Sequence, residues 1–400
     1  MKKREYYTRW FFWNVLSKLF IYAKLKRDYK FSLSPDSGVY PTPPFLVVSN
    51  HGTFFDPWII GNYSRWPFSI MVNDDGFRGK GISQWYLTNI GCIPKRKGAS
   101  DYKAMKETLD RLKNGYPVCV FPEGQTTWDG ETQLLYKGLE KIVLKMKCPI
   151  VTVRLRGNFL TKPWWARNIR RGNITIDIKV HTPQDYQDLT SDQLFEKIKS
   201  SIYQNDIKDP QNLQYPFTGT KIAEGLERFV WICMNCSSED ALSTDGNTIH
   251  CSSCGSSWEM DAHCRLKAKG NDTHSLHDLK DWADMHKSKV IEKIRSGATV
   301  LSTSHNVILQ NENSNRTFSN CATGSATLTA DTLTFNPPSG PVTWPVSEIE
   351  DYVIQKKDIF EFRHGKNYIR FLFSKKSPMK WVYYLRYLKG FEECERRGYL

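Results

Sequence analysis

The sequence predicts an α/β domain with a largely parallel sheet, followed by a small cysteine-rich ribbon and a β-rich C-terminal domain. Three observations lead to this prediction. Apolar segments of strand length alternate with segments of helical periodicity over about the first half of the 400 residues. Four cysteines then occur as two closely spaced pairs, and most of the remaining chain consists of short strand-like segments. A chain of this length can hold two or three domains.

The α/β prediction depends on the order of the apolar segments. Residues 45–48, 118–121 and 150–155 are short apolar runs typical of buried strands. Residues 135–146 carry apolar side chains at helical spacing between the second and third of these runs, and residues 174–180 add a further strand. Alternation of this kind favours parallel strands whose carboxyl ends gather the ligand-binding residues.

Polar residues follow two of these strands. His51 and Asp56 come just after the first, and Glu123 follows the second. A histidine and an aspartate at this spacing can place a carboxylate against one imidazole nitrogen, which leaves the other nitrogen as a base. No serine or cysteine is placed to be an enzyme's own nucleophile. The simplest chemistry is therefore direct: His51 takes a proton from a substrate hydroxyl, and that oxygen attacks an activated acyl group.

Four motifs in this region resemble those of the glycerolipid acyltransferase family, in order and in spacing. The first is the H-x4-D string from His51 to Asp56, and the second is the glycine followed by basic residues at 91–96. The third is Phe-Pro-Glu-Gly at 121–124, and the fourth is a proline-containing apolar strand at 148–153. The resemblance covers roughly the first half of the chain. It implies acyl transfer from acyl-CoA or acyl carrier protein to a lysophospholipid, 1-acylglycerol-3-phosphate or a related one.

The resemblance and the charges assign roles to the motif residues. His51 is predicted to be the general base, and Asp56 to fix its tautomer and stabilise the imidazolium. The predicted substrate-binding residues are Asn50, Gly91, Lys95, Arg96, Glu123 and Gly124. The two basic residues of this set could hold the acceptor's phosphate, arginine through a bidentate fork. For the last two residues of the set, the resemblance implies contact with the acceptor.

The third motif departs from the family pattern at one point. Many family members continue it as Thr-Arg, and that arginine is a phosphate ligand, whereas residues 125–127 here are Gln-Thr-Thr. A bare phosphomonoester is therefore less strongly indicated, and the acceptor's headgroup stays open. Four arginines further along the chain could take the missing role: Arg154, Arg156, Arg170 and Arg171.

The chain is strongly basic, with a formal charge of +14 and a pI of about 9.2. This balance favours acidic partners, and anionic membrane lipid is one of them. Residues 1–30 are predicted to form a basic amphipathic helix that contacts the membrane, and its apolar face consists of Phe12, Val15, Leu16, Leu19 and Ala23. The alternative is an ordinary helix packed on the domain.

The hydropathy of the chain bears on where it works. We find no run of roughly 18 apolar residues that would make a transmembrane helix. No cleavable signal peptide is evident either. We therefore expect a peripheral protein on the cytoplasmic face of a membrane.

Four of the ten cysteines predict a metal site. Cys233 and Cys236 form one C-x2-C pair, and Cys251 and Cys254 form a second pair after fourteen intervening residues. Two such pairs at this separation are typical of a zinc ribbon, in which four thiolates close a tetrahedral Zn²⁺. Four thiolates leave no open coordination position, so the zinc is predicted to be structural. The pairing also favours a reducing compartment.

The remaining domain limits follow from composition and periodicity. We expect the α/β acyltransferase domain at 31–220, the ribbon at 225–265, a connecting helix at 275–297 and a β-rich domain with a closing helix at 298–400. The strands expected in the last domain are 300–304, 307–310, 326–335, 342–346, 359–363 and 368–373. Antiparallel strands capped by one C-terminal helix resemble a pleckstrin-homology barrel in architecture. Membrane contact, carrier recognition and dimerisation stay open as its role.

Other functions compete with acyl transfer to a lysophospholipid. One is transfer to a different hydroxyl or amine acceptor, and another is a non-catalytic lipid-binding protein on the same scaffold. The intact His51 and Asp56 favour catalysis over the second. Nucleic-acid binding would concentrate basic residues in the ribbon, but residues 233–259 contain no Lys or Arg. No nucleic-acid partner is therefore expected.

Overall fold

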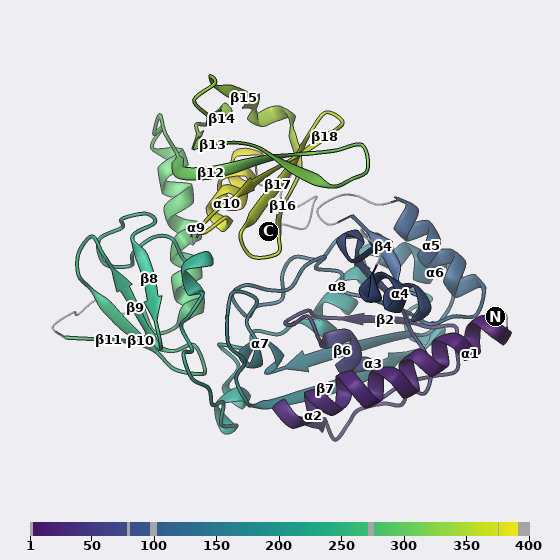
Figure 1. Ribbon diagram of the computed structural model, residues 1–400. Helices are drawn as coiled ribbons and strands as arrows, with labels where there is room; N and C mark the ends of the chain where they lie inside the picture. The colour runs from purple at the N-terminus through teal and green to yellow at the C-terminus, as the bar shows by residue number, and fades with distance from the viewer. Residues whose placement is uncertain (1–2, 78–80, 97–101, 271–275, 375, 391–400) are drawn as a thin grey trace. The chain divides into compact units, whose positions relative to one another are not determined.

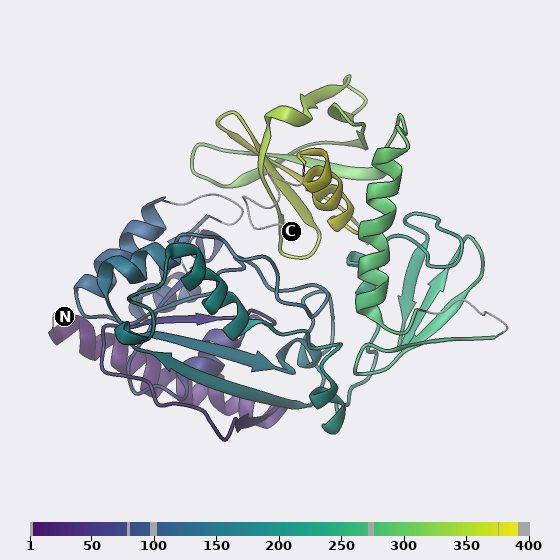
Figure 2. The same ribbon diagram turned by 180° about the vertical axis from the view of Figure 1, so that it is seen from behind.

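The computed structural model describes residues 3–77, 81–96, 102–270, 276–374 and 376–390 (Figures 1 and 2). The chain divides into two compact units. The first comprises Met1–Trp164 and Ile169–Thr218, and the second comprises Trp165–Asn168 and Gly219–Leu400. The acyltransferase-like motifs lie in the first unit, and the paired cysteines lie in the second.

The first unit is built on a seven-stranded sheet in the order β1-β7-β6-β2-β5-β3-β4. Its strands are β1 (Lys30–Leu33), β2 (Leu46–Ser49), β3 (Ser69–Asn73), β4 (Ile93–Lys95), β5 (Val118–Val120), β6 (Ile150–Arg156) and β7 (Asn173–His181). Neighbouring strands are parallel except for β6 and β7, which are antiparallel. The prediction of an α/β domain with a largely parallel sheet is therefore confirmed.

Helices cover both faces of this sheet. They are α1 (Lys3–Phe11), α2 (Ala23–Asp28), α3 (Asp56–Gly61), α4 (Ile82–Asn89), α5 (Tyr102–Lys113), α6 (Leu139–Met146), α7 (Asn158–Thr161) and α8 (Ser191–Ile202). Successive residues of a strand point to opposite faces. Along β2, Val47 joins a core with the N-terminal helix and α3, whereas Leu46 and Val48 join a second core with α5, α6 and α8. Strands buried on both faces read as continuous apolar runs, which is why the sequence located β2, β5 and β6, whereas β1, β3 and β4 were not predicted.

The N-terminal helix differs from the regular amphipathic helix that the sequence predicts. Between α1 and α2 lies a π-helical segment, η1 (Phe12–Tyr22), after which a backbone N–H reaches five residues back to a carbonyl. The side chains that η1 buries are Phe12, Trp13, Ser17 and Tyr22. They recur about every five residues because a π-helix holds more residues per turn than an α-helix. Of the face predicted to contact the membrane, Leu19 and Ala23 are exposed, whereas Phe12 is buried against the domain.

This helix packs on the sheet with one side and leaves apolar side chains on the other. Trp13 is buried and donates its indole N–H to the Phe68 carbonyl at 2.9 Å. Leu19 and Phe20, in contrast, are 63% and 71% exposed. Within the ranges that the structure describes, no helix is long and apolar enough to cross a membrane.

Three neighbouring strands deliver polar residues to one edge of the sheet. β2 leads into His51, β5 leads into Glu123, and β6 leads into Asn158. Because β5, β2 and β6 are adjacent and parallel, their carboxyl ends meet at the same edge. This edge is where the sheet topology places a site.

The second unit begins with a four-stranded antiparallel sheet in the order β11-β10-β9-β8. Its strands are β8 (Leu242–Asp245), β9 (Thr248–Cys251), β10 (Ser257–Met260) and β11 (Leu266–Ala268). Trp258 of β10 packs edge-on against Trp282 of the long helix α9 (Leu279–Arg295), with ring centroids 5.5 Å apart. Two fully buried tryptophans thus join the small sheet to this helix.

The rest of the second unit is a seven-stranded antiparallel sheet in the order β15-β14-β13-β12-β18-β17-β16. The strands are β12 (Ser302–Glu312), β13 (Phe318–Leu328), β14 (Thr332–Asn336), β15 (Val342–Pro345), β16 (Ile349–Gln355), β17 (Ile359–His364) and β18 (Asn367–Leu372). Helix α10 (Met379–Leu388) covers the sheet with Trp381, whose ring stacks on Phe373 at 5.9 Å. A β-rich region with a closing helix is therefore present, as predicted.

The individual strand predictions for this region need three corrections. The expected strands 300–304 and 307–310 are one strand, β12, and the interruption in their sequence is a bulge where Asn306 adopts a φ of 57°. The expected strand 326–335 is instead the end of β13, a turn and β14. Strand β16 was not predicted, because Glu350 and Asp351 interrupt its apolar pattern near the start.

Candidate functional site

His51 and Asp56 are in contact at the edge formed by β2, β5 and β6. The His51 Nδ1 atom lies 2.9 Å from the Asp56 Oδ2 atom. The Asp56 side chain is fully buried, whereas the His51 side chain is 18% exposed. An ionised carboxylate only accepts hydrogen bonds, so Nδ1 carries the proton and Nε2 carries the lone pair. The structure thus places these two predicted residues in the arrangement that base catalysis requires.

The turn between β2 and α3 fixes the Asp56 carboxylate. Its Oδ2 atom also accepts the backbone N–H groups of Gly52 and Thr53, at 2.8 and 2.9 Å. Its Oδ1 atom accepts the Thr53 hydroxyl at 2.7 Å. Asp56 stands in the first turn of α3 and reaches back over this short turn. The hydrogen bonds set the plane of the carboxylate and therefore the direction of the imidazole that donates to it.

The His51 ring and backbone are held by further contacts. The ring stacks on Phe121, with centroids 4.3 Å apart and planes inclined by 26°. The His51 carbonyl accepts the Thr127 N–H at 2.9 Å. The Nε2 atom makes no hydrogen bond to any residue that the structure describes. This nitrogen is consequently available to take a proton.

Glu123 anchors the backbone beside His51. Its side chain is buried, and its two oxygens accept the backbone N–H groups of His51 and Gln133, each at 2.6 Å. Burial raises the pKa of Glu123 well above its usual range, and the two N–H donors oppose that shift. An acceptor hydroxyl would have to share oxygens that already hold two short hydrogen bonds. These contacts give Glu123 a part in orienting His51.

A shallow pocket adjoins the pair. The residues that line it are Asn50, His51, Gly52, Glu123, Thr127, Gly130, Thr132, Asn158, Phe159 and Asp206. Two of the predicted substrate-binding residues, Asn50 and Glu123, are among them. The Asn50 side-chain amide donates to the Leu155 carbonyl and accepts the Leu155 N–H, both at 2.8 Å. Asn50, which follows β2, thus joins this strand to β6 through two hydrogen bonds beside the pocket.

The predicted basic residues lie beside the third motif. Lys95 and Arg96 are half-buried at the end of β4. A Cβ atom added at Gly124 would lie 3.9 Å from the Lys95 ammonium nitrogen. The same ammonium lies over the Tyr136 ring, 4.9 Å from its centroid. The structure therefore brings Lys95 and Gly124 together, next to the segment that carries Glu123.

Gly91, in contrast, lies away from this group. Its φ is +83°, a conformation that favours glycine. A Cβ atom there would lie 2.5 Å from the guanidinium carbon of Arg9, which is buried in α1. Gly91 therefore packs against the N-terminal helix, and it is absent from the residues that line the described pocket.

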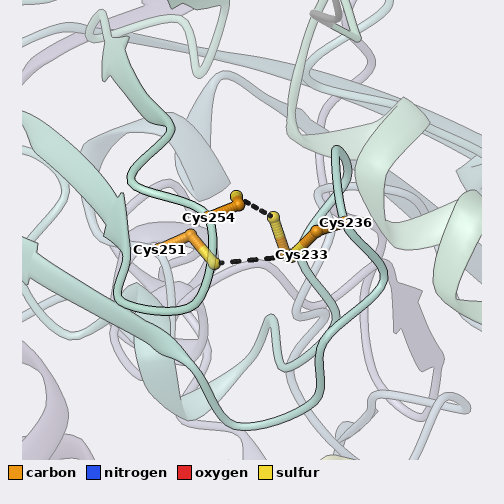
Figure 3. Close-up of side chains that lie close together, drawn as sticks. All are labelled: Cys233, Cys236, Cys251 and Cys254. Atoms are coloured by element: carbon orange, nitrogen blue, oxygen red, sulfur yellow. Dashed lines mark hydrogen bonds between the residues drawn. The ribbon is translucent and has the colours of Figure 1, made fainter.

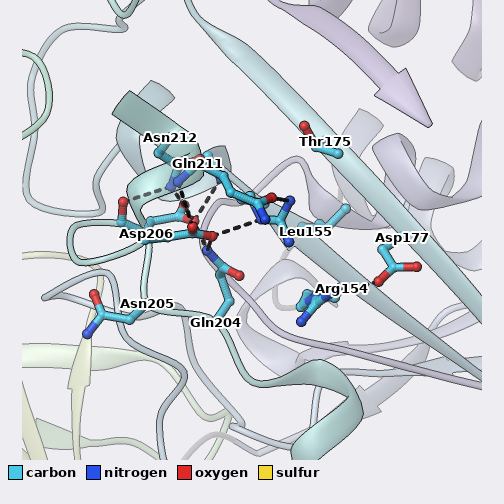
Figure 4. Close-up of polar contacts among 12 residues, drawn as sticks. Arg154, Leu155, Thr175, Asp177, Gln204, Asn205, Asp206, Gln211 and Asn212 are labelled. Carbon is cyan, nitrogen blue, oxygen red and sulfur yellow. Dashed lines mark hydrogen bonds and ion pairs between the residues drawn. The ribbon is translucent and has the colours of Figure 1, made fainter. Parts of the chain in front are cut away.

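Three of the four arginines considered as substitute phosphate ligands have other partners or are buried. Arg154 pairs with Asp177 at 2.8 Å (Figure 4). Arg156 pairs with Asp209 at 2.8 Å. Arg170 is only 1% exposed. None of these three lines the described pocket, so the geometry gives no support to the substitution.

The four predicted zinc ligands come together in the second unit. The Sγ atoms of Cys233, Cys236, Cys251 and Cys254 all lie within 4.8 Å of one another (Figure 3). The Cys233–Cys254 and Cys236–Cys251 pairs are each 3.8 Å apart. A tetrahedron with Zn–S bonds of about 2.3 Å has S···S edges of about 3.8 Å, so this set fits a Zn²⁺ ion. Among the described residues, no other group of three or more His, Cys, Asp or Glu could hold a metal.

Two of these cysteines have local donors that favour the thiolate. The Ser238 hydroxyl lowers the pKa of Cys236. The Ser256 hydroxyl and N–H lower the pKa of Cys254 to about 6. A thiolate is the form that binds a metal, so these neighbours suit a metal site.

The first cysteine pair is tied to both helices of the second unit. Glu239, shortly after Cys236, pairs with Lys293 of α9 at 2.7 Å. Asp240 pairs with Lys380 of α10, whose side chain is fully buried. The loop that carries two of the four thiolates therefore also anchors the two helices.

Two buried polar residues of the active-site edge were not predicted from the sequence. Asn158 and Asp206 both line the pocket. Asn158 follows β6 directly, and its place after a parallel strand was a signal available in the sequence. Asp206 follows α8, and its sequence surroundings carry no comparable signal.

The family match covers the region that carries this geometry. Residues 33–156 match the family described as Acyltransferase. Relatives include a 1-acyl-sn-glycerol-3-phosphate acyltransferase of Chlamydomonas reinhardtii, which is 27% identical over 166 residues. A chloroplastic 1-acyl-sn-glycerol-3-phosphate acyltransferase of Brassica napus is 25% identical over 163 residues. Each match covers 40% of this chain and 49% or 46% of the relative, so the chain spans about half the length of the curated relatives it matches.

A solved structure also aligns with the chain. It is the 1-acyl-sn-glycerophosphate acyltransferase PlsC from Thermotoga maritima, at a TM-score of 0.39 and 17% identity, covering 50% of this chain and 95% of that one.

The fold and the His51–Asp56 edge, together with the family match, define an acyltransferase-type domain. More particularly, residues 33–156 match the Acyltransferase family, and the relatives that this region resembles carry the name 1-acyl-sn-glycerol-3-phosphate acyltransferase.

Proposed function

We propose that this protein transfers a fatty acyl group from acyl-CoA or acyl carrier protein to the free hydroxyl of a lysophospholipid, 1-acylglycerol-3-phosphate or a related one. The observation that carries the proposal is the His51–Asp56 pair, in which Nδ1 is bound at 2.9 Å and Nε2 has no partner among the described residues. The acyltransferase family match over residues 33–156 supports the reaction class.

In this mechanism one imidazole nitrogen both takes and returns a proton. His51 Nε2 removes the proton of the acceptor hydroxyl while the hydroxyl oxygen bonds to the thioester carbonyl carbon. Asp56 stabilises the imidazolium that forms. Collapse of the tetrahedral intermediate breaks the C–S bond, and the imidazolium protonates the departing thiolate. General base catalysis of this kind contributes about 10²–10⁴-fold to the rate.

Lys95 and Arg96 are the proposed ligands of the acceptor's phosphate. Lys95 approaches Gly124, so a phosphate held there would lie beside the segment that carries Glu123. Glu123 and Asn50 line the pocket next to His51, where the glycerol end of the acceptor would enter. Gly91 would act indirectly, by letting Arg9 pack beneath the strand that carries Lys95.

Anionic lipid on the cytoplasmic face of a membrane is the proposed partner of residues 1–30. The outer side of the helix exposes Trp10 by 41%, Phe11 by 46% and Phe20 by 71%. Exposed aromatics beside lysines and arginines suit the headgroup layer. Each basic residue near an anionic surface contributes about 1 kcal/mol, falling off within a Debye length.

The second unit is proposed to be structural and regulatory rather than catalytic. A Zn²⁺ ion on the four cysteines would close the ribbon at 225–265, since the S···S distances of 3.8 Å suit it. Of the connecting helix predicted at 275–297, α9 (Leu279–Arg295) is the described helical part, and we assign the strands β12 to β18 with α10 to a pleckstrin-homology-type barrel; residues 391–400 of the predicted domain lie outside the described residues. The order of the seven antiparallel strands and the covering helix α10 support that resemblance.

An assay with defined substrates tests the proposed activity. Purified protein would be offered labelled acyl-CoA or acyl carrier protein with vesicles that contain one lysophospholipid at a time. Formation of the diacyl product with at least one lysophospholipid is expected. A folded, vesicle-bound protein that forms no product with any of them would instead be the non-catalytic lipid-binding alternative. Product formed only with amine acceptors would show that the acceptor is an amine and not a lysophospholipid hydroxyl.

A further inference from the structure

Asn158 supplies the Asp56 carboxylate with a donor from outside its own turn. The Asn158 side-chain N–H donates to Asp56 Oδ1 at 3.1 Å, across 102 positions of sequence. Asn158 is only 1% exposed. Every other hydrogen-bond donor to Asp56 among the described residues comes from residues 51–53, so Asn158 alone joins this carboxylate to the segment that follows β6.

The same amide also packs tightly against the turn after His51. A Cβ atom added at Gly52 would lie 2.6 Å from the Asn158 side-chain nitrogen, and 2.8 Å from the rest of the amide. Gly52 does not have a positive φ, so its backbone conformation does not require glycine. Its missing side chain matters instead because it leaves room for a neighbouring group. The glycine of the first motif therefore makes room for Asn158.

Asp206 holds the backbone on both sides of Asn158. Its Oδ1 atom accepts the Gly157 N–H at 2.7 Å, and its Oδ2 atom accepts the Phe159 N–H at 2.9 Å. Asp206 is itself 1% exposed. Gln204 and Asn212 donate to it at 3.1 and 3.3 Å, in the cluster that Figure 4 shows. This one carboxylate therefore accepts backbone hydrogen bonds from both residues that flank Asn158.

We propose that Asn158 is a positioning residue for the His51–Asp56 pair, and that Asp206 sets its place by clamping the Gly157–Phe159 segment. The inference rests on the proposed function. Asn158 touches no reacting atom in this scheme. It acts through Asp56, by fixing the Oδ1 side of a carboxylate whose Oδ2 side orients the imidazole.

The energetic reason lies in the burial of Asp56. A buried carboxylate needs a donor at each lone-pair direction, and losing one leaves it free to turn toward the remaining donors. The turn would change the angle at which His51 Nδ1–H meets Oδ2. At metal sites, outer partners that orient a ligating histidine typically contribute about 10–100-fold to affinity or activity, and we take the same scale for His51. A loss of that size in kcat, with KM changed by less than about threefold, is expected because the proposed phosphate ligands Lys95 and Arg96 are untouched.

The test compares two variants that disturb the amide in different ways. Asn158→Leu removes the donor and keeps the volume, and Gly52→Ala displaces the amide while leaving every polar group in place. Thr152→Val is the matched control, because Thr152 is a buried polar residue of β6, the strand that precedes Asn158, and it binds His181 and not Asp56. Both kinetics and ¹⁵N-histidine NMR of His51 would be measured on protein that melts cooperatively.

The proposal expects both variants to lower kcat by about 10–100-fold, with the control within about twofold of wild type. It also expects the Nδ1–H signal of His51 to shift or broaden in both variants. Full kcat with an unchanged Nδ1–H signal in Asn158→Leu would overturn it, and so would an equal loss in the control. If the wild-type protein shows no acyl transfer, the NMR comparison still decides the positioning role, so failure of the proposed function is distinguished.

Discussion

Backbone N–H groups hold the acidic residues of the active-site edge. Asp56 accepts two of them, from Gly52 and Thr53. Glu123 and Asp206 likewise accept two each. A buried carboxylate without donors is costly, so each of these residues is stable only in the backbone arrangement seen here. The acidic residues thus define the shape of the loops around His51.

Asp206 gives a prediction about pH. Burial raises the pKa of Asp206 from 3.8 to about 6, so the folded state binds its proton more tightly than the unfolded state does. The stability from this group is therefore fully present below about pH 4 and is lost as the pH rises through about 6. Chemical denaturation of wild type and Asp206→Asn measures the effect. Between pH 5 and pH 7.5, the free energy of unfolding of wild type should fall by about 1–1.5 kcal/mol relative to that of Asp206→Asn. A difference that is constant with pH would contradict the raised pKa.

The sequence located the residues whose partners are near in the chain. His51 and Asp56 could be paired because five positions of a turn bring them together. Asn158 could not be paired with Asp56, because 102 positions separate them and only the sheet order joins β2 to β6. The role of Glu123 in holding the His51 backbone could not be predicted either, since its partners are backbone N–H groups, which have no signature in the sequence.

At the scale of elements, the N-terminal helix has two sides with different tasks. Its buried side contributes Phe12, Trp13, Tyr22 and Leu25 to the core of the first unit. Its outer side exposes Leu19 and Phe20. Deleting the helix would remove core side chains, so membrane binding has to be tested at the exposed positions.

The double variant Leu19→Ser, Phe20→Ser should bind anionic vesicles more weakly by about tenfold or more, because each exposed apolar side chain is worth about 1.5–3 kcal/mol when fully buried. Its melting temperature should stay within a few degrees of wild type. Co-sedimentation with vesicles at low and high salt measures the effect. Val39→Ser is the control, since Val39 is 86% exposed outside this helix. If the double variant binds vesicles as well as wild type does, the membrane contact must lie on another element.

The cysteine ribbon is the second element with a direct test. Native protein should contain about one Zn²⁺ per chain by mass spectrometry. Cys254→Ser should lose the metal and increase hydrogen exchange in the ribbon and in α9 and α10, because Glu239 and Asp240 anchor those helices. Cys321→Ser should keep the metal and leave hydrogen exchange unchanged, since this exposed cysteine lies outside the cluster. A metal-free protein with a protected ribbon would contradict the assignment.

Element types were more predictable than element details. The central strands β2, β5 and β6 were found because burial on both faces leaves uniform apolar runs, whereas the less buried strands β1, β3 and β4 were not predicted. A 100° periodicity grouped Phe12 with Leu19 and Ala23, although the π-helical segment η1 buries Phe12 and leaves the other two side chains exposed. Strand β16 escaped notice because Glu350 and Asp351 stand within it, at a register shift in its pairing with β17.

At the scale of the whole molecule, the family match and the proposed catalytic pair lie in the first unit alone. Residues 33–156 contain His51, Asp56 and Glu123, whereas the cysteines and the β-rich sheet belong to the second unit. The curated relatives share about half of their length with this chain. The proposed chemistry therefore belongs to the first unit.

The central claim is that His51 is the base that activates the acceptor hydroxyl. The measurement is the initial rate of acyl transfer to the preferred lysophospholipid by wild type, His51→Ala and His181→Ala. His181 is the matched control, because it is a partly buried histidine of the same sheet whose Nε2 binds Thr152 at 3.0 Å. The account predicts that His51→Ala loses at least about 10²–10⁴-fold in kcat while its fold and melting temperature are retained, and that His181→Ala stays near wild type. A folded His51→Ala protein with near wild-type turnover would contradict it.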